Sequence, residues 1–150
     1  MPKASVKRLI ECKKKQLIDL VLDIEKYPEF VPFCLDAKVY EKKEKDDLTL
    51  IIADLTIGKG SFKDTYKSDV KFHKRDNLIK VTNIKGPLNH LENTWRFSDH
   101  DNGTEISFDI DFEIENKFLN IVMAKSFQFG LDKIADAFQK RAIDLYNKLN

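Results

Sequence analysis

The sequence contains little of what marks linkers, disulfide scaffolds or membrane spans. Only 5 glycines and 4 prolines occur in 150 residues, without a Pro/Gly-rich stretch, which favours a single domain without a hinge. The two cysteines, Cys12 and Cys34, are too few for a disulfide framework, so we expect reduced, partly buried thiols. No stretch approaches the ~20 apolar residues that span a bilayer, and the first residues lack a signal-peptide core. We therefore expect a soluble, cytoplasmic protein.

Motifs of common catalytic and metal sites are also missing. His73, His90 and His100 have no HxxxH or HExxH spacing and no cysteine partners, so we expect no metal site. The sequence contains no GxSxG, P-loop or GxGxxG motif. We predict a protein that is not an enzyme and that requires no cofactor.

Neither sign of charge dominates the sequence. Basic and acidic residues number 26 and 25, and the net charge is +1, which gives no reason to expect DNA binding. Basic residues do cluster at Lys13, Lys14 and Lys15. This cluster could contact phosphate or an anionic membrane surface, although a solvated helix start is the simpler interpretation.

Alternation of apolar and polar residues predicts a series of strands. The clearest case is 105–114, where five apolar residues alternate with five polar ones, so that one face meets a core and the other meets water. The outer row includes Asp109, Asp111 and Glu113, for which a solubilising face is the simpler interpretation than an acid/base site. Further strands are predicted at 5–11, 39–45, 48–57, 62–72, 78–84 and 91–97. Consecutive strands without intervening helices are mainly antiparallel.

Helical periodicity occurs near both ends of the chain. It predicts a helix over 13–23 and a long helix from Asn116, a reasonable N-cap, to about residue 148. Gly130 lies inside the long pattern and indicates a bend or a close approach to the sheet. The segment 27–33 contains two prolines and is predicted to form a short helical turn.

This order of elements predicts an α+β fold in which a curved antiparallel sheet of six or seven strands wraps round the C-terminal helix. Seven strands are roughly 30 Å across, whereas a helix covers only about 10 Å, so the sheet must curl. The interior could be an ordinary core or a pocket for a flat apolar ligand. Its inward-facing candidates are Leu55, Ile57, Phe62, Tyr66, Leu91, Trp95, Phe97, Phe108, Ile110, Phe112, Phe118, Val122 and Phe129.

Four short segments stand out in order along the chain. They read YPEFVPFC at 27–34, GPLNHLENTWRF at 86–97, DFEIENK at 111–117 and AFQKRAIDLY at 137–146. Together they resemble the YPxFxPxC, GPxxxLxxxWxF, DFEFxNK and AFxxRAxxxY motifs of the RatA-like proteins and their mitochondrial coenzyme-Q-binding relatives. These proteins belong to the START-like polyketide cyclase (SRPBCC) superfamily. This chain has Phe33 where the coenzyme-Q-binding members often have tryptophan.

The resemblance implies one START-like domain over 1–150 with a helix-grip fold. It also implies non-catalytic binding of ubiquinone or a related isoprenoid lipid, in support of respiratory electron transfer. For this site we select Phe30 and Phe33, with Tyr66 or Asn93 as a polar anchor for the head group. Apolar contacts are expected from Leu55, Ile57, Phe62, Leu91, Trp95, Phe108, Ile110, Phe118, Val122 and Phe129.

The same resemblance leaves two other functions open. A RatA-like ribosome-association toxin would bind the large ribosomal subunit and block subunit joining. Its surface contacts would be Lys13, Lys14, Lys15, Lys133, Lys140 and Arg141, and binding would weaken steeply with salt. An aromatase or cyclase would need a buried His, Asp or Arg facing the pocket, whereas Arg96 has outward parity. Transient contact with the inner membrane is also compatible with the lipid-binding interpretation.

Overall fold

The computed structural model describes residues 3–59, 62–85, 88–114 and 117–146, with residues 59, 62, 85, 88, 89, 114 and 118–127 described by their backbone only. The chain begins with β1 (Lys3–Ile10), α1 (Lys14–Leu22) and the 3-10 helix η1 (Ile24–Glu29). Six strands follow: β2 (Cys34–Lys45), β3 (Leu48–Lys59), β4 (Phe62–His73), β5 (Leu78–Lys85), β6 (Leu88–His100) and β7 (Gly103–Ile114). The last described element is α2 (Lys117–Tyr146).

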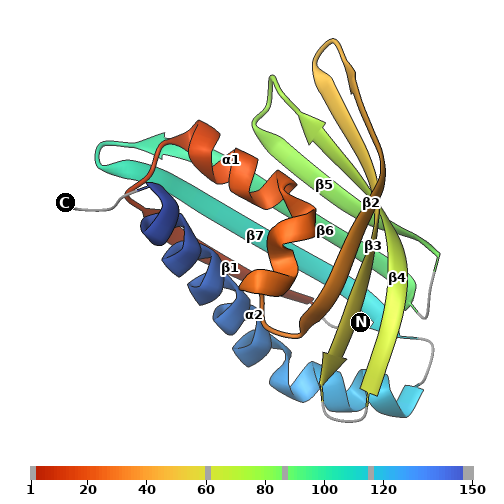
Figure 1. The fold of residues 1–150 in the computed structure, drawn as a ribbon. Helices are drawn as coiled ribbons and strands as arrows, with labels where there is room; N and C mark the ends of the chain where they lie inside the picture. Colours follow the sequence, from red (N-terminus) through yellow and green to blue (C-terminus); the bar gives the residue numbers. More distant parts are fainter. Residues whose placement is uncertain (1–2, 60–61, 86–87, 115–116, 147–150) are drawn as a thin grey trace.

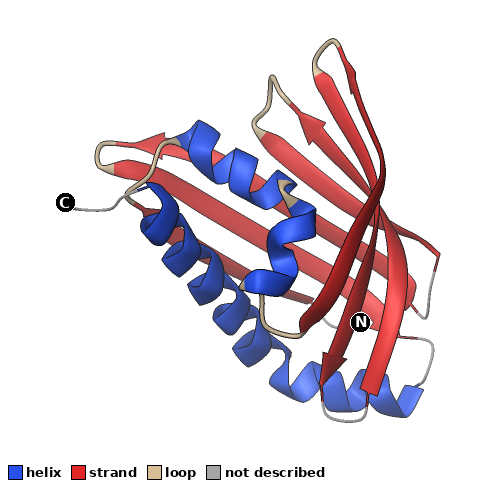
Figure 2. Ribbon diagram, in the orientation of Figure 1, coloured by secondary structure: helices blue, strands red, loops and turns tan. Residues whose placement is uncertain are grey.

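All seven of these strands form one antiparallel sheet in the order β1-β7-β6-β5-β4-β3-β2. The sheet curves, and α1, η1 and α2 all lie on its inner side (Figures 1 and 2). α2 runs along the side of the sheet formed by β1 and β7, while η1 lies beside β2 (Figure 1). The predicted α+β class and the helix-grip arrangement are confirmed.

The alternation in β7 determines which side of the sheet is buried. Ile106, Phe108 and Phe112 are 5–7% exposed, whereas the acidic side chains between them face outward. On that outer side Asp109 pairs with Arg96 at 3.2 Å, and Asp111 lies 3.9 Å from Lys3. The carboxylate row therefore lies on the outer surface, as predicted.

Three of the hairpin turns place residues in the left-handed backbone region. Asp46 and Asn77 have φ of 50° and 49°, and Gly103 has φ of 157°. At Gly103 an added Cβ would lie 2.1 Å from the carbonyl oxygen of Ile10. Glycine is therefore required here because the turn before β7 passes directly against the end of β1.

β2 begins at Cys34, five positions earlier than the predicted start at residue 39. Two irregularities, between Cys34 and Asp36 and between Val39 and Glu41, interrupt its pairing with β3. Each bulge shifts the alternation by one residue, so the apolar pattern of the first half of β2 does not look like a strand. Asn116, the predicted N-cap of the long helix, lies outside the described residues.

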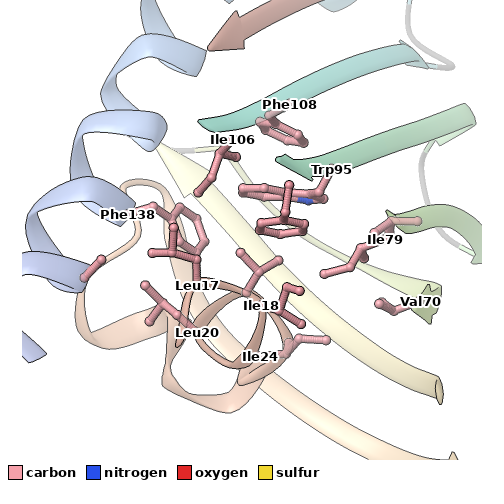
Figure 3. Close-up of a cluster of buried hydrophobic side chains, with 14 of the residues drawn as sticks. Leu17, Ile18, Leu20, Ile24, Val70, Ile79, Trp95, Ile106, Phe108 and Phe138 are labelled. Carbon is pink, nitrogen blue, oxygen red and sulfur yellow. The ribbon is translucent and has the colours of Figure 1, made fainter. Parts of the chain in front are cut away.

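The end of the interior beneath α1 is a filled hydrophobic core (Figure 3). Trp95 stacks on Phe108 with ring centroids 4.1 Å apart, and Phe138 of α2 meets Trp95 edge-on at 5.2 Å. The void beside these rings is about 20 Å³, room for a single water. At this end the interior is an ordinary hydrophobic core, and Trp95 and Phe108 belong to it.

Candidate ligand-binding site on the inner face of the sheet

Residues from the first and last of the four singled-out segments meet in space. Phe138 contacts both Tyr27 and Phe30 edge-on, with ring centroids 5.4 Å and 5.1 Å apart. Arg141 adds an ion pair to Glu29 at 2.8 Å and lies 5.1 Å above the Phe30 ring. η1 is thereby fastened to the last turns of α2, which closes the inner side of the sheet next to the core.

The chain leaves this junction through an unusual backbone at Phe33. Its φ is 70°, which costs a non-glycine residue of order 1 kcal/mol. The Phe33 carbonyl accepts a hydrogen bond from the amide of Gly58 at 2.9 Å, which ties this loop to β3. A Cβ on Gly130 would lie 4.0 Å from the Phe33 ring. This is an ordinary contact distance, so among the described residues Gly130 makes no close approach to the sheet, and the atom that comes within 4.0 Å belongs to the η1–β2 connection.

Four polar side chains form a stripe across the inner face of β4, β5 and β6. Tyr66 and Ser68 share the inward parity of β4, Asn83 pairs with Ser68 in the register, and Asn93 pairs with Val81. The Ser68 hydroxyl donates to the carbonyl of Ala53, and the Asn83 side-chain oxygen accepts from the amide of Leu91 at 3.0 Å. We call these four residues, Tyr66, Ser68, Asn83 and Asn93, the polar stripe.

Asn93 differs from Ser68 and Asn83 because its side-chain oxygen has no hydrogen-bond partner among the described residues, although the atom is buried. An unpaired buried polar atom costs about 1–3 kcal/mol, and such atoms in native proteins need an explanation. A bound head group or an ordered water could satisfy it. Asn93 was predicted as a polar anchor; its inward orientation is as expected, and its role in binding stays a prediction.

Burial changes the acidity of the groups around the stripe. It raises the pKa of Tyr66 and of Tyr27, and the proximity of Tyr66 and of the Cys34 thiol adds to the effect at Tyr27. Burial also raises the pKa of Cys34 to about 11. These groups are therefore protonated at neutral pH, and the Tyr66 hydroxyl can act as a hydrogen-bond donor. Tyr27 already donates to the carbonyl of Val21.

The other predicted site residues occupy several environments. Leu91, with Phe97 and Phe112, is buried in the inner face, and Leu55 and Ile110 are partly buried against the core. Ile57 is half-buried near the end of β3. The side chains of Phe62, Phe118 and Val122 lie outside the described residues. Ser68 and Asn83 were missed. Ser68 has the parity of Tyr66, which was assigned to the inner face, whereas no inner face was assigned to the strand that contains Asn83.

The prediction that the Phe129 side chain faces the interior is wrong. Its side chain is 64% exposed, whereas Leu131 and Phe138 are 2% and 4% exposed. Residues two positions apart on a helix point about 200° away from each other, so Phe129 and Leu131 cannot both face the sheet. The packing selects Leu131, which lies two turns before Phe138 on the same face.

The predicted surface cations fall into two groups. Lys13, Lys15, Lys133 and Lys140 are exposed. Lys14 pairs with Asp99 at 3.0 Å, and both Lys14 and Arg141 have side chains only 27% exposed. Arg141 therefore does not belong to an outward basic face, because it turns inward to cover Phe30 and to pair with Glu29.

A separate cleft of about 690 Å³ opens between α1 and the tips of the β2–β3 and β4–β5 hairpins. Its lining includes the apolar residues Ile18 and Phe72 and the charged residues Lys42, Lys74 and Glu44. The hairpin tips are tied together where the Lys74 amide donates to the carbonyl of Asp47. Its charges are mixed in sign, which does not favour a wholly apolar ligand.

No helix in the described part of the chain is long and apolar enough to span a membrane. Within the same residues, no three His, Cys, Asp or Glu side chains converge into a group that could hold a metal ion.

The chain matches a family described as polyketide cyclase / dehydrase and lipid transport over residues 10–139. It is 33% identical over 138 residues to the ribosome association toxin RatA of Rickettsia prowazekii, covering 90% of this chain and 92% of that one. It is also 33% identical over 138 residues to the mitochondrial coenzyme Q-binding protein COQ10 of Dictyostelium discoideum, covering 90% of this chain and 66% of the relative.

Solved structures show the same fold. An 18 kDa protein from Caulobacter crescentus superposes with a TM-score of 0.82 at 24% identity, over 99% of this chain and all of the other. The Zhui aromatase/cyclase from a Streptomyces species gives a TM-score of 0.75 at 12% identity, over 93% of this chain and 92% of that one. The chain belongs to the polyketide cyclase / dehydrase and lipid transport family, within the START-like superfamily, and has both RatA and coenzyme Q-binding relatives.

Proposed function

We propose that this protein binds ubiquinone or a related isoprenoid lipid, with the head group on the polar stripe and the apolar body against the inner face of the sheet. The proposed role is non-enzymatic support of respiratory electron transfer by a single cytoplasmic domain that visits the inner membrane. The supporting observation is the buried, unpaired side-chain oxygen of Asn93. The coenzyme Q-binding relative supports the choice of ligand class.

The chemistry of the polar stripe matches a quinone or quinol head group. A quinone ring has carbonyl acceptors and a quinol has hydroxyl donors, and both need partners when they leave water. An asparagine amide presents both an acceptor and a donor group, and protonated Tyr66 adds a donor. The surrounding positions Leu91, Phe112 and Leu55 are apolar and suit the rest of such a molecule.

Binding without catalysis is favoured by the kinds of group in the stripe. Its members are amides and hydroxyls, and the pKa of Tyr66 is raised, away from the range useful for proton transfer at neutral pH. The fold family includes aromatase/cyclases, but fold alone does not imply their chemistry.

The test replaces Asn93 with leucine. Because the Asn93 oxygen is unpaired, Asn93→Leu removes a buried polar group without breaking a hydrogen bond to it, and stability should be unchanged or higher. Organic extracts of the purified protein, analysed by mass spectrometry, should contain near-stoichiometric quinone for the wild type and several-fold less for the variant. Thr94→Leu, on the next residue of β6 and facing the other side of the sheet, is the matched control and should retain the lipid.

Two results would contradict this proposal. One is a wild-type extract without quinone or other isoprenoid lipid from a host that makes them. The other is equal lipid content in the Asn93→Leu and wild-type proteins. Melting temperatures of all three proteins establish that differences in lipid content do not come from unfolding.

Ribosome association is the second candidate function, supported by the name of the Rickettsia relative and by exposed lysines. Of the predicted contacts, Lys13, Lys15, Lys133 and Lys140 are exposed, although Lys15 pairs with Asp19 at 2.9 Å and Lys133 lies over the Phe129 ring. Sedimentation with large ribosomal subunits at low salt, lost in Lys13→Glu/Lys15→Glu and at high salt, would support this role. Absence of cosedimentation at low salt would contradict it.

A further inference from the structure

The unpaired polar atom on the inner face of the sheet is a hydrogen-bond acceptor. The atom of Asn93 that is buried without a hydrogen-bond partner among the described residues is its side-chain oxygen. An amide oxygen can only accept hydrogen bonds, whereas the amide nitrogen of the same side chain can only donate them. Whatever satisfies this oxygen must therefore supply an N–H or an O–H group.

The neighbouring side chains do not supply that group. Along β6 the inner-face neighbours of Asn93 are Leu91 and Trp95, and across the sheet they are Val81 of β5 and Ile110 of β7. Three of the four are aliphatic. The fourth, Trp95, carries an indole N–H, but it makes no hydrogen bond to the Asn93 oxygen. The acceptor is thus left open among apolar and aromatic side chains.

An ordered water is the weaker of the two possible partners for this oxygen. A buried water typically makes two to four hydrogen bonds to protein groups, and these four neighbours offer at most the Trp95 indole in addition to Asn93. A ligand hydroxyl is different, because the apolar body of the ligand holds it in place and one hydrogen bond to the protein is enough. The surroundings of Asn93 therefore favour a ligand that carries a hydroxyl.

We propose that the site selects the reduced, hydroquinone form of its ligand over the oxidised quinone, because a ring hydroxyl can donate to the Asn93 oxygen and a ring carbonyl cannot. This inference rests on the proposed function, since it concerns the redox form of the same ligand. A quinone carbonyl can accept from the Asn93 amide nitrogen, but the buried oxygen then stays unpaired. The Tyr66 hydroxyl suits both forms, because it can donate to a carbonyl or accept from a hydroxyl.

The expected preference for the hydroquinone is about tenfold. This factor lies within the range of costs for leaving a buried acceptor unpaired, a cost that only the oxidised form incurs. The quinone takes up two electrons and two protons to become the hydroquinone. For such a two-electron couple, tenfold tighter binding of the reduced form raises the midpoint potential of the bound couple by about 30 mV.

The experiment is anaerobic equilibrium dialysis of the full chain, stripped of lipid, against decylubiquinone and decylubiquinol. The wild type should bind the quinol about tenfold more tightly than the quinone. Asn93→Leu should lose this preference through weaker quinol binding, with quinone binding unchanged or slightly stronger. Asn93→Thr, whose hydroxyl can donate as well as accept, should bind both forms alike.

A redox titration of the bound couple gives a second readout. The midpoint potential should rise by about 30 mV on binding to the wild type and should hardly change on binding to Asn93→Leu. Thr94→Leu, which faces the other side of the sheet, is the matched control and should keep the wild-type preference. The ratio of the two affinities is measured within one protein, so it does not depend on the folded fraction of a variant.

The possible failures are distinguishable from failure of the proposed function. Equal binding of both forms by the wild type, or tighter binding of the quinone, would overturn the preference and leave the proposed function intact. A preference that persists in Asn93→Leu would overturn the role of Asn93 in it. Binding of neither form would remove the proposed function, together with the preference that rests on it.

Discussion

Phe30 and Phe138 meet edge to face, with ring centroids 5.1 Å apart and ring planes at 86°, although Phe30 precedes β2 and Phe138 lies in the second half of α2. Phe138 also contacts Tyr27 and Trp95. A single helical side chain thus joins η1, β6 and α2. Edge-to-face pairs stabilise beyond the area that they bury, so this junction holds α2 against the inner side of the sheet.

Truncation of Phe138 should therefore be severe. Phe138→Ala leaves a cavity among three aromatic rings and should lower the free energy of unfolding by about 3–5 kcal/mol. Phe138→Leu fills part of that space and should cost less. Urea unfolding followed by Trp95 fluorescence measures both. Ile143→Ala, at a position 40% exposed on the same helix, is the control and should change stability little; a similar loss in the control would contradict the central role of Phe138.

The ion pair between Glu29 and Arg141 should make a pH-dependent contribution. Its hydrogen bond from Arg141 holds the pKa of Glu29 below its usual value. A carboxyl whose folded-state pKa is depressed contributes stability above its unfolded pKa and loses it as pH falls through the folded pKa. A double-mutant cycle of Glu29→Gln and Arg141→Met should give a small favourable coupling between pH 5 and 7 that disappears toward pH 3.

Both side chains of this pair are partly in water, so high salt should also reduce the coupling. The control pair is Lys15 and Asp19, an exposed i,i+4 pair within α1, whose coupling should be weak as well but should not affect the attachment of η1. A Glu29–Arg141 coupling that persists unchanged at pH 3 would show that the contact is not ionic.

Two glycines should respond in opposite directions to the same substitution. At Gly103, an added Cβ would meet the Ile10 oxygen at 2.1 Å and the Glu11 Cα at 2.9 Å, and backbone atoms cannot move aside cheaply. Gly103→Ala should lower stability by roughly 2–4 kcal/mol. At Gly130 the nearest atom among the described residues would be 4.0 Å away, so Gly130→Ala should raise stability by about 0.5–1 kcal/mol.

Thermal unfolding of the two variants beside the wild type measures this contrast. A destabilised Gly130→Ala protein would mean that α2 needs the backbone freedom of glycine where it passes the Phe33 ring. An unaffected Gly103→Ala protein would mean that the turn before β7 can move away from β1.

Local sequence patterns were sufficient for most of the fold. Alternation in 105–114 predicted both the strand and its buried face, because side chains on a strand point to opposite sides with a period of two. Turn residues at 46–47, 76–77 and 101–103 predicted hairpins, since aspartate, asparagine and glycine tolerate left-handed backbone. The early start of β2 was missed because bulges shift the alternation.

The candidate site was predictable only in part. Strand parity correctly predicted that Leu91, Asn93 and Tyr66 face inward, and Ser68 was missed only because it is polar. Asn83 was missed because the apolar residues of 78–84 do not share one parity, so no inner face was assigned to that strand. Helical periodicity could not separate Phe129 from Leu131, because α2 is apolar on more than one face and only its docking against β1 and β7 selects the buried one. Arg141 was assigned to a basic surface because nothing local indicates that Glu29 and Phe30 lie beside it.

The order of apolar, polar and turn-forming residues along this chain is enough to dictate its strands, its helices and the curved sheet, because each element needs one apolar face and short antiparallel connections. Contacts between distant segments determine the rest: the junction of Phe30 with Phe138, the unpaired oxygen of Asn93 and the exposure of Phe129. These features depend on how the sheet curls and how α2 is rotated against it. The packing of the whole core determines both, and no local sequence pattern indicates either.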